Sequence, residues 1–154
     1  MLRAEPSSWF SWNYDVRDGG QAVCTLSNRF GRSAGSFDLA GSRFAIHREP
    51  RWGDFVLTGA TGEIARAKKT SMVTFHFRVS VNGAAYDFDA DSMFSRNFPL
   101  RHEGSRGGRE LGAVRSERFF SRTALAELPE TIPPDLQIFL IWLVLLIWRR
   151  QSDG

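Results

Sequence analysis

Hydrophobic and polar residues alternate in short runs between Trp9 and Leu128, and turn-forming residues separate the runs. Alternation with a period of two is typical of strands that bury one face. The clearest hairpin contains Asn82-Gly83, because Asn-Gly suits a turn in which both central residues have positive φ. The expected strands cover residues 9–16, 21–26, 36–39, 43–48, 53–58, 63–68, 72–81, 84–89, 95–100, 111–117 and 122–128. The pattern thus predicts about ten to twelve antiparallel strands and no helix before Pro133.

A different pattern follows, because every residue from Ile138 to Trp148 is apolar. We predict a helix over residues 134–149, since Pro134 and Asp135 suit a first turn and Arg149 and Arg150 suit a last turn. A helix that is apolar on every side lies inside a protein or inside a membrane. The residues expected to define this central helix are Leu136, Phe139, Leu140, Trp142, Leu143, Leu146 and Trp148.

The length of the apolar segment favours the protein interior. Residues 136–148 would reach about 20 Å at ~1.5 Å per residue, whereas the hydrocarbon of a bilayer is ~30 Å thick. Arg149 and Arg150 on the cytoplasmic side would also place the preceding residues outside, although the N-terminus lacks the apolar stretch of a signal peptide. We therefore expect a core helix, and the alternative is a tail-anchored integral protein with residues 136–148 in the bilayer.

Composition fits one globular domain with 42% hydrophobic and 24% charged residues. We assign residues 9–150 to the domain, residues 1–8 to an N-terminal tail and residues 151–154 to a C-terminal tail. Cys24 is the single cysteine, so no intramolecular disulfide can form. Together with the absent signal peptide, this predicts a cytoplasmic protein, either free or peripheral at the inner membrane surface.

A many-stranded antiparallel meander followed by one apolar C-terminal helix resembles the tubby C-terminal-like superfamily, which includes LURP-one-related proteins and phospholipid scramblases. The resemblance implies a mostly β fold, in which about 12 antiparallel strands form a closed barrel around the hydrophobic C-terminal helix. Closure removes exposed strand edges, and a helix about 10 Å across fills a lumen that strand side chains alone cannot fill.

One local motif adds to this resemblance. Asp89-Ala90-Asp91, followed by Phe98-Pro99-Leu100, is similar to the proposed calcium loop of the scramblases. Asp89 and Asp91 are therefore the candidate metal ligands. However, Arg101 stands where the closing acid is expected, and a calcium loop needs several oxygen ligands. We expect both aspartates to face solvent at a strand end.

Catalytic motifs are absent from the sequence. His47, His76 and His102 are scattered, and no zincin, zinc-ribbon, hydrolase-elbow or phosphate-loop motif occurs. We therefore expect a non-enzymatic protein with no catalytic residue and no cofactor.

Basic residues supply the candidate binding site. Arg66 and Lys68 share one strand face, opposite Ala65 and Ala67. In tubby proteins a basic barrel surface binds phosphoinositide head groups, and the resemblance implies the same use here. The candidate lipid-binding residues are Arg48, Arg51, Arg66, Lys68 and Lys69.

The favoured function is a peripheral module that binds anionic phospholipid or phosphoinositide at a membrane surface. A solvated outer face on a purely structural or interaction domain is the alternative for the same basic residues. A small-ligand carrier would need a lumen that the helix fills. The sequence lacks a nucleic-acid-binding motif, so nucleic acid is not expected as a partner, and it identifies no protein partner.

Overall fold

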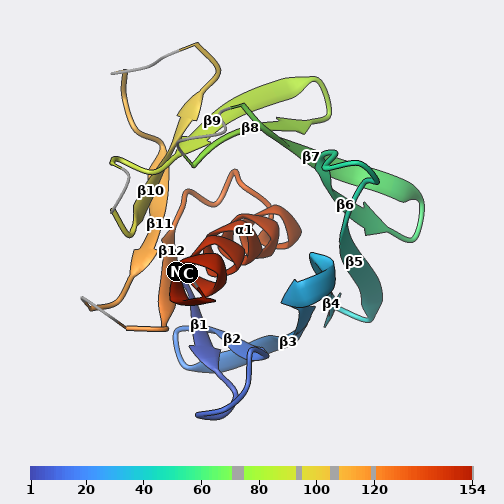
Figure 1. The fold of residues 1–154 in the computed structure, drawn as a ribbon, viewed down its shortest axis with the longest axis vertical. Coiled ribbons are helices and arrows are strands. Elements are labelled where there is room, and N and C mark those ends of the chain that lie inside the picture. Colours follow the sequence, from blue (N-terminus) through green and yellow to red (C-terminus); the bar gives the residue numbers. More distant parts are fainter. Residues whose placement is uncertain (71–74, 93–94, 105–107, 119–120, 154) are drawn as a thin grey trace.

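A closed antiparallel barrel surrounds one central helix in the computed structural model of the chain (Figure 1). The structure describes residues 1–70, 75–92, 95–104, 108–118 and 121–153. Its elements are β1 (Leu2–Pro6), β2 (Tyr14–Asp18), β3 (Gln21–Arg29), the 3-10 helix η1 (Phe30–Arg32), β4 (Ala34–Leu39), β5 (Ser42–Arg48), β6 (Phe55–Gly59), β7 (Gly62–Lys69), β8 (His76–Val81), β9 (Ala84–Asp89), β10 (Asn97–His102), β11 (Gly112–Ser116), β12 (Ala124–Glu127) and α1 (Pro134–Asp153). Each strand pairs with the next in sequence, and β1 pairs with β12. The predicted 12-stranded barrel is confirmed.

Short turns join the strands at positions that the sequence marks. Asn82 and Gly83 have φ of 46° and 79° between β8 and β9, as the Asn-Gly signal predicts. Gly19 and Gly20 also have positive φ, at 55° and 89°, between β2 and β3. These turns let neighbouring strands pair directly, which produces the meander.

The N-terminal boundary differs from our prediction. Residues 1–8 are not a tail, because Leu2–Pro6 forms β1 and closes the barrel between β2 and β12. The predicted strand over residues 9–16 is partly wrong, since β2 begins at Tyr14 and residues 9–13 are a loop. Residues 72–74 of another predicted strand lie outside the described residues.

The helix α1 forms the centre of the core. Every residue from Leu136 to Trp148 is buried, with Trp142 fully buried and Trp148 only 4% exposed. Burying each large apolar side chain contributes roughly 1.5–3 kcal/mol, so the gross contribution of the helix is on the order of tens of kcal/mol. The prediction of a core helix is confirmed. The prediction of a C-terminal tail from residue 151 is wrong, because α1 continues beyond residue 149 to Asp153. Among the described residues, no helix has both the length and the apolar character that a membrane span requires.

Aromatic side chains fix the helix within the barrel. The ring of Trp142 lies 5.9 Å from that of Phe30 and 5.6 Å from that of Phe55. Gln137, the one polar residue in the buried segment, donates through Nε2 to the carbonyl of Ile132 at 2.9 Å. Its polar group is therefore satisfied inside the core.

The barrel has two distinct ends. Because all strands are antiparallel neighbours, the loops after β1, η1, β5, β7, β9 and β11 lie at one end, and the remaining turns lie at the other. The helix follows β12, so it begins at the second end and finishes at the first. We call these the entry end and the exit end of the helix. Contacts of Arg149 with Trp12 and of Arg150 with Phe55 agree with this placement.

Candidate functional site

Strand alternation places two cations inside the exit end. Ile46 of β5 faces the core, so Arg48, two residues later, is the next inward position. Ala65 and Ala67 of β7 are likewise buried, and Lys69 is the next inward position of that strand. The strands thus bring these two side chains to the rim of the barrel.

The same alternation, extended to the residues just before β10 and β12, places two further cations at the rim, near the end of α1. Arg96 precedes buried Phe98 by two residues, and Arg122 precedes buried Ala124 by two residues. The helix adds basic residues in its last turns. We call this group the cationic collar: Arg48, Lys69, Arg96, Arg122, Arg149 and Arg150.

Aromatic rings form cation–π contacts with the charged groups of the collar. The Arg48 guanidinium carbon lies 4.8 Å from the ring centroid of Phe55, and that of Arg96 lies 4.1 Å from the ring centroid of Trp148. Two other collar members, Arg122 and Arg149, lie 4.4 Å and 4.9 Å from the ring centroid of Trp12. The Nζ of Lys69 lies 5.4 Å from the ring of Phe75. Such contacts hold a cation without neutralising it.

Five of the six collar residues form no ion pair with a described carboxylate. Within the described part of the chain, no Asp or Glu oxygen lies within 4.0 Å of a basic nitrogen of Arg48, Lys69, Arg96, Arg122 or Arg150. Burial lowers the pKa of Lys69, and the charges of Arg150 and Arg48 lower it further. Burial, followed by the charge of Arg48, also lowers the pKa of Arg150. An anion at the exit end would relieve this repulsion.

Backbone carbonyls accept hydrogen bonds from three collar members, Arg48, Arg96 and Arg122. Arg96 Nη2 donates to the carbonyl of Ser121 at 2.6 Å, and Arg122 Nη1 donates to the carbonyl of Trp9 at 2.9 Å. Arg122 also donates to the carbonyl of Ser11. Burial raises the pKa of Tyr14, against a smaller opposing effect of Arg122. These contacts position the guanidinium groups but leave their positive charge available.

Arg66, the leading candidate from the sequence, lies in a different environment. Its guanidinium contacts three carboxylates: Asp54 at 3.1 Å, Glu63 at 2.7 Å, and Glu49. Hydrogen bonds from Arg66 lower the pKa of Glu63. A phosphate would have to compete with these acids, so Arg66 is poorly suited to bind one.

The other predicted lipid-binding residues divide between the wall and the exit end. Arg66 and Lys68 do share the outer face of β7 opposite buried Ala65 and Ala67, and Lys68 is exposed. Arg51 is exposed in the exit-end loop after β5. The structure therefore brings Arg48, Arg51 and Lys69 to one end of the barrel and leaves Lys68 on its side.

The two candidate metal ligands have protein partners. Asp89 Oδ1 lies 3.1 Å from His76 Nδ1, and Asp91 accepts a hydrogen bond from Asn97 Nδ2 at 2.7 Å. Among the described residues, no group of three or more His, Cys, Asp or Glu side chains could hold a metal ion. Asp89 and Asp91 therefore lack the further ligands that a calcium site would need among the described residues.

The sequence analysis did not identify Arg96, Arg122, Arg149 and Arg150 as site residues, because they come from three segments that are far apart in the chain. A usable signal was present, however. In a strand, every second residue faces the core. Counting two residues onward from the last buried position of β5 and of β7 reaches a cation at the rim of the barrel. The same step before Phe98 and Ala124 finds Arg96 and Arg122.

Comparison with family models, with curated proteins and with solved structures found no match to this chain. The residues themselves and their arrangement therefore carry the evidence on function.

Proposed function

We propose that this protein is a non-enzymatic peripheral module that binds anionic phospholipid at a membrane surface, and that the cationic collar makes the contact. The observation that carries the proposal is the convergence of five cations at one barrel end, where no described carboxylate forms an ion pair with any of them: Arg48, Lys69, Arg96, Arg122 and Arg150. Lipid phosphates would supply the missing counter-charge, each nearby cation contributing ~1 kcal/mol.

Charge at the opposite end supports this orientation. The described charged residues of the entry end are mostly acidic: Asp18, Glu103, Arg109, Glu110, Glu127, Glu130 and Asp135. Acids at both ends have cationic partners. At the exit end Glu49 and Asp54 contact Arg66, and Glu117 contacts Arg3. At the entry end Asp18 contacts the N-terminus, Glu103 contacts Arg78 and Glu127 contacts Arg115, so the difference between the ends lies in the collar cations. An anionic surface would therefore attract the exit end and repel the entry end.

Co-sedimentation with vesicles tests the proposal. The protein should sediment with vesicles that contain phosphatidylserine and should remain in solution with pure phosphatidylcholine. Replacing Arg48, Lys69 and Arg150 together with Gln should weaken binding to anionic vesicles by about 100-fold, since three contacts of ~1 kcal/mol are removed. Equal binding to both vesicle types, or binding to neither, would reject the proposal.

A matched variant controls for total charge. Replacing Arg43, Arg78 and Arg115 with Gln removes the same formal charge from the barrel wall, where these residues pair with Asp38, Glu103 and Glu127. This variant should retain most of the binding. Circular dichroism of both variants checks that the barrel is intact.

The integral, tail-anchored alternative has a separate outcome. Alkaline carbonate should release the protein from membranes if it is peripheral, whereas retention would support insertion of residues 136–148. The barrel closed around α1 is also the arrangement expected of the tubby C-terminal-like superfamily. We propose a distant relationship to that superfamily on this basis. We also propose a cytoplasmic location at the inner membrane surface, because a chain with Cys24 as its single cysteine suits a reducing compartment.

A further inference from the structure

The exit end carries exposed aromatic side chains beside the collar. Trp9 is 84% exposed, Phe10 is 90% exposed and Trp52 is 85% exposed. All three lie on exit-end loops, residues 7–13 after β1 and 49–54 after β5. Large aromatic side chains are normally buried, so such exposure at one end of a barrel marks an interaction surface.

Collar arginines hold both loops. Arg122 donates hydrogen bonds to the carbonyls of Trp9 and Ser11, which fixes the first loop. Arg48 donates to the carbonyls of Gly53 at 3.0 Å and Trp52 at 3.4 Å, which fixes the second. The exposed rings and the cations are thus parts of one assembly.

The backbone at Trp52 is unfavourable for its side chain. Arg51 and Trp52 have φ of 60° and 61°, in the left-handed region that few residues other than glycine adopt. Trp52 gains little burial in return, because its contact with Arg48 at 5.1 Å leaves most of the ring in water. Folding alone does not account for a tryptophan at this position, and strained, exposed residues are typical of functional surfaces.

We propose that Trp9, Phe10 and Trp52 enter the interfacial region of an anionic bilayer, so that the barrel stands with its exit end on the membrane and the entry end toward water. Tryptophan favours the head-group level of a bilayer, because its ring is apolar and its N–H stays hydrated. The collar lies directly behind these rings and meets the lipid phosphates. This inference rests on the proposed function and adds the orientation and the inserted residues.

Site-specific labelling tests the orientation. In a Cys24→Ser background, Phe10→Cys, Trp52→Cys and Ala60→Cys are each labelled with an environment-sensitive nitrobenzoxadiazole group. Ala60 is an exposed residue of the turn between β6 and β7 at the entry end. Vesicles containing phosphatidylserine should shift the emission at positions 10 and 52 to the blue and leave position 60 unchanged.

Substitution supplies a second readout. Trp52→Gly should weaken binding to anionic vesicles by about tenfold, since one large aromatic contact with lipid is lost. Its melting temperature should hardly change, because glycine adopts positive φ without strain. A structural role for Trp52 would instead lower the melting temperature.

The outcomes separate the two proposals. Binding to anionic vesicles with the labels at 10 and 52 still in water would overturn the orientation and leave the proposed function standing. No binding to anionic vesicles by the unmodified protein would overturn both. A blue shift produced by duplex DNA and not by vesicles would assign the surface to nucleic acid and overturn both as well.

Discussion

Gly35 shows how closely single residues of the wall approach the central helix. A Cβ at this position would lie 2.5 Å from Trp142 Nε1 and 2.9 Å from Asn28 Oδ1. Trp142 is fully buried between Phe30 and Phe55, so its indole has little room to move. The absence of a side chain at residue 35 is therefore a packing requirement.

Gly35→Ala should destabilise the protein by about 1–3 kcal/mol through overpacking. Urea unfolding measures the change in the free energy of unfolding. Gly31→Ala is the control, because a Cβ there meets nothing within 4 Å, and its stability should stay close to that of the unmodified protein. Equal effects of the two substitutions would show that the contact with Trp142 is not the cause.

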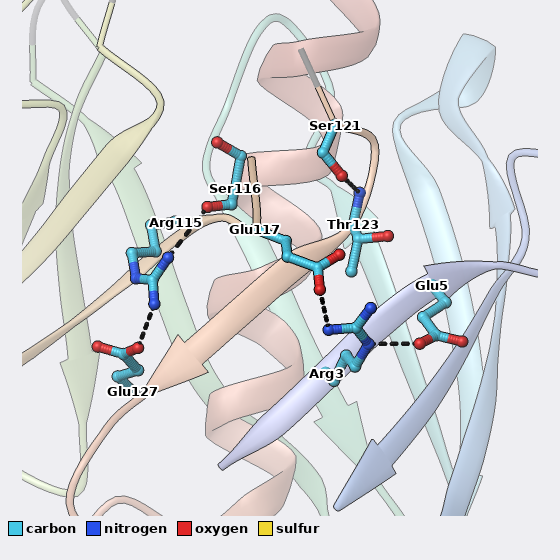
Figure 2. Close-up of polar contacts among 8 residues, drawn as sticks. All are labelled: Arg3, Glu5, Arg115, Ser116, Glu117, Ser121, Thr123 and Glu127. Carbon is cyan, nitrogen blue, oxygen red and sulfur yellow. Dashed lines mark hydrogen bonds and ion pairs between the residues drawn. The ribbon is translucent and has the colours of Figure 1, made fainter. Parts of the chain in front are cut away.

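At the scale of elements, the barrel depends on the seam between its first and last strands. Only Leu2, Arg3 and Ala4 of β1 pair with β12. Arg3 lies at this seam and contacts Glu5 on its own strand and Glu117 just beyond β11, the latter at 2.5 Å (Figure 2). Arg3 thus links the N-terminal strand to a segment more than one hundred residues away.

This link predicts a pH dependence. Hydrogen bonds from Arg3 lower the pKa of Glu117 below its ordinary value of 4.5. A carboxylate whose pKa is lower in the folded state stabilises the fold above pH 4.5, and the contribution is lost as pH falls through the folded-state pKa. Arg3→Gln should therefore reduce stability at neutral pH, and this difference from the unmodified protein should shrink under acid. Urea unfolding at neutral and acidic pH measures it, and a constant difference would contradict the role of Glu117.

Local pattern was sufficient for most strands and for the helix, but not for the seam. Alternation and Asn-Gly turns report pairing between neighbours in the chain, and β5, β7 and α1 were predicted near their observed positions. β1 is short and ends at Pro6, and its pairing with β12 is the longest-range contact of the sheet. Strand periodicity contains no information about such a partner.

The candidate site could likewise be predicted from the sequence only in part. Arg66 and Lys68 were correctly placed on one strand face, but two of the acids that surround Arg66 come from the loop after β5 and the third, Glu63, from β7 itself. Lys69 and Arg48 were grouped with them by sequence, whereas alternation turns both toward the barrel interior. Only the closed fold reveals that they meet the end of α1.

At the scale of the whole molecule, charge and exposed aromatic rings follow the barrel axis. The helix has 20 residues, so the two ends are about 30 Å apart at ~1.5 Å per residue. Screening at physiological salt reduces charge interactions beyond ~8 Å. A membrane bound at the exit end would therefore respond to charge at that end and hardly to charge at the other.

Two variants with the same charge change test this dependence on position. Ser8→Lys adds a cation beside Trp9 at the exit end, and Thr131→Lys adds one at the entry end. Ser8 and Thr131 are both exposed. The first should strengthen binding to anionic vesicles by about fivefold, as expected for ~1 kcal/mol, and the second should leave it unchanged. Raising the salt concentration should remove the gain of Ser8→Lys, because the added interaction is electrostatic. Equal gains from both lysines would show that total charge, and not the end of the barrel that carries it, determines membrane binding.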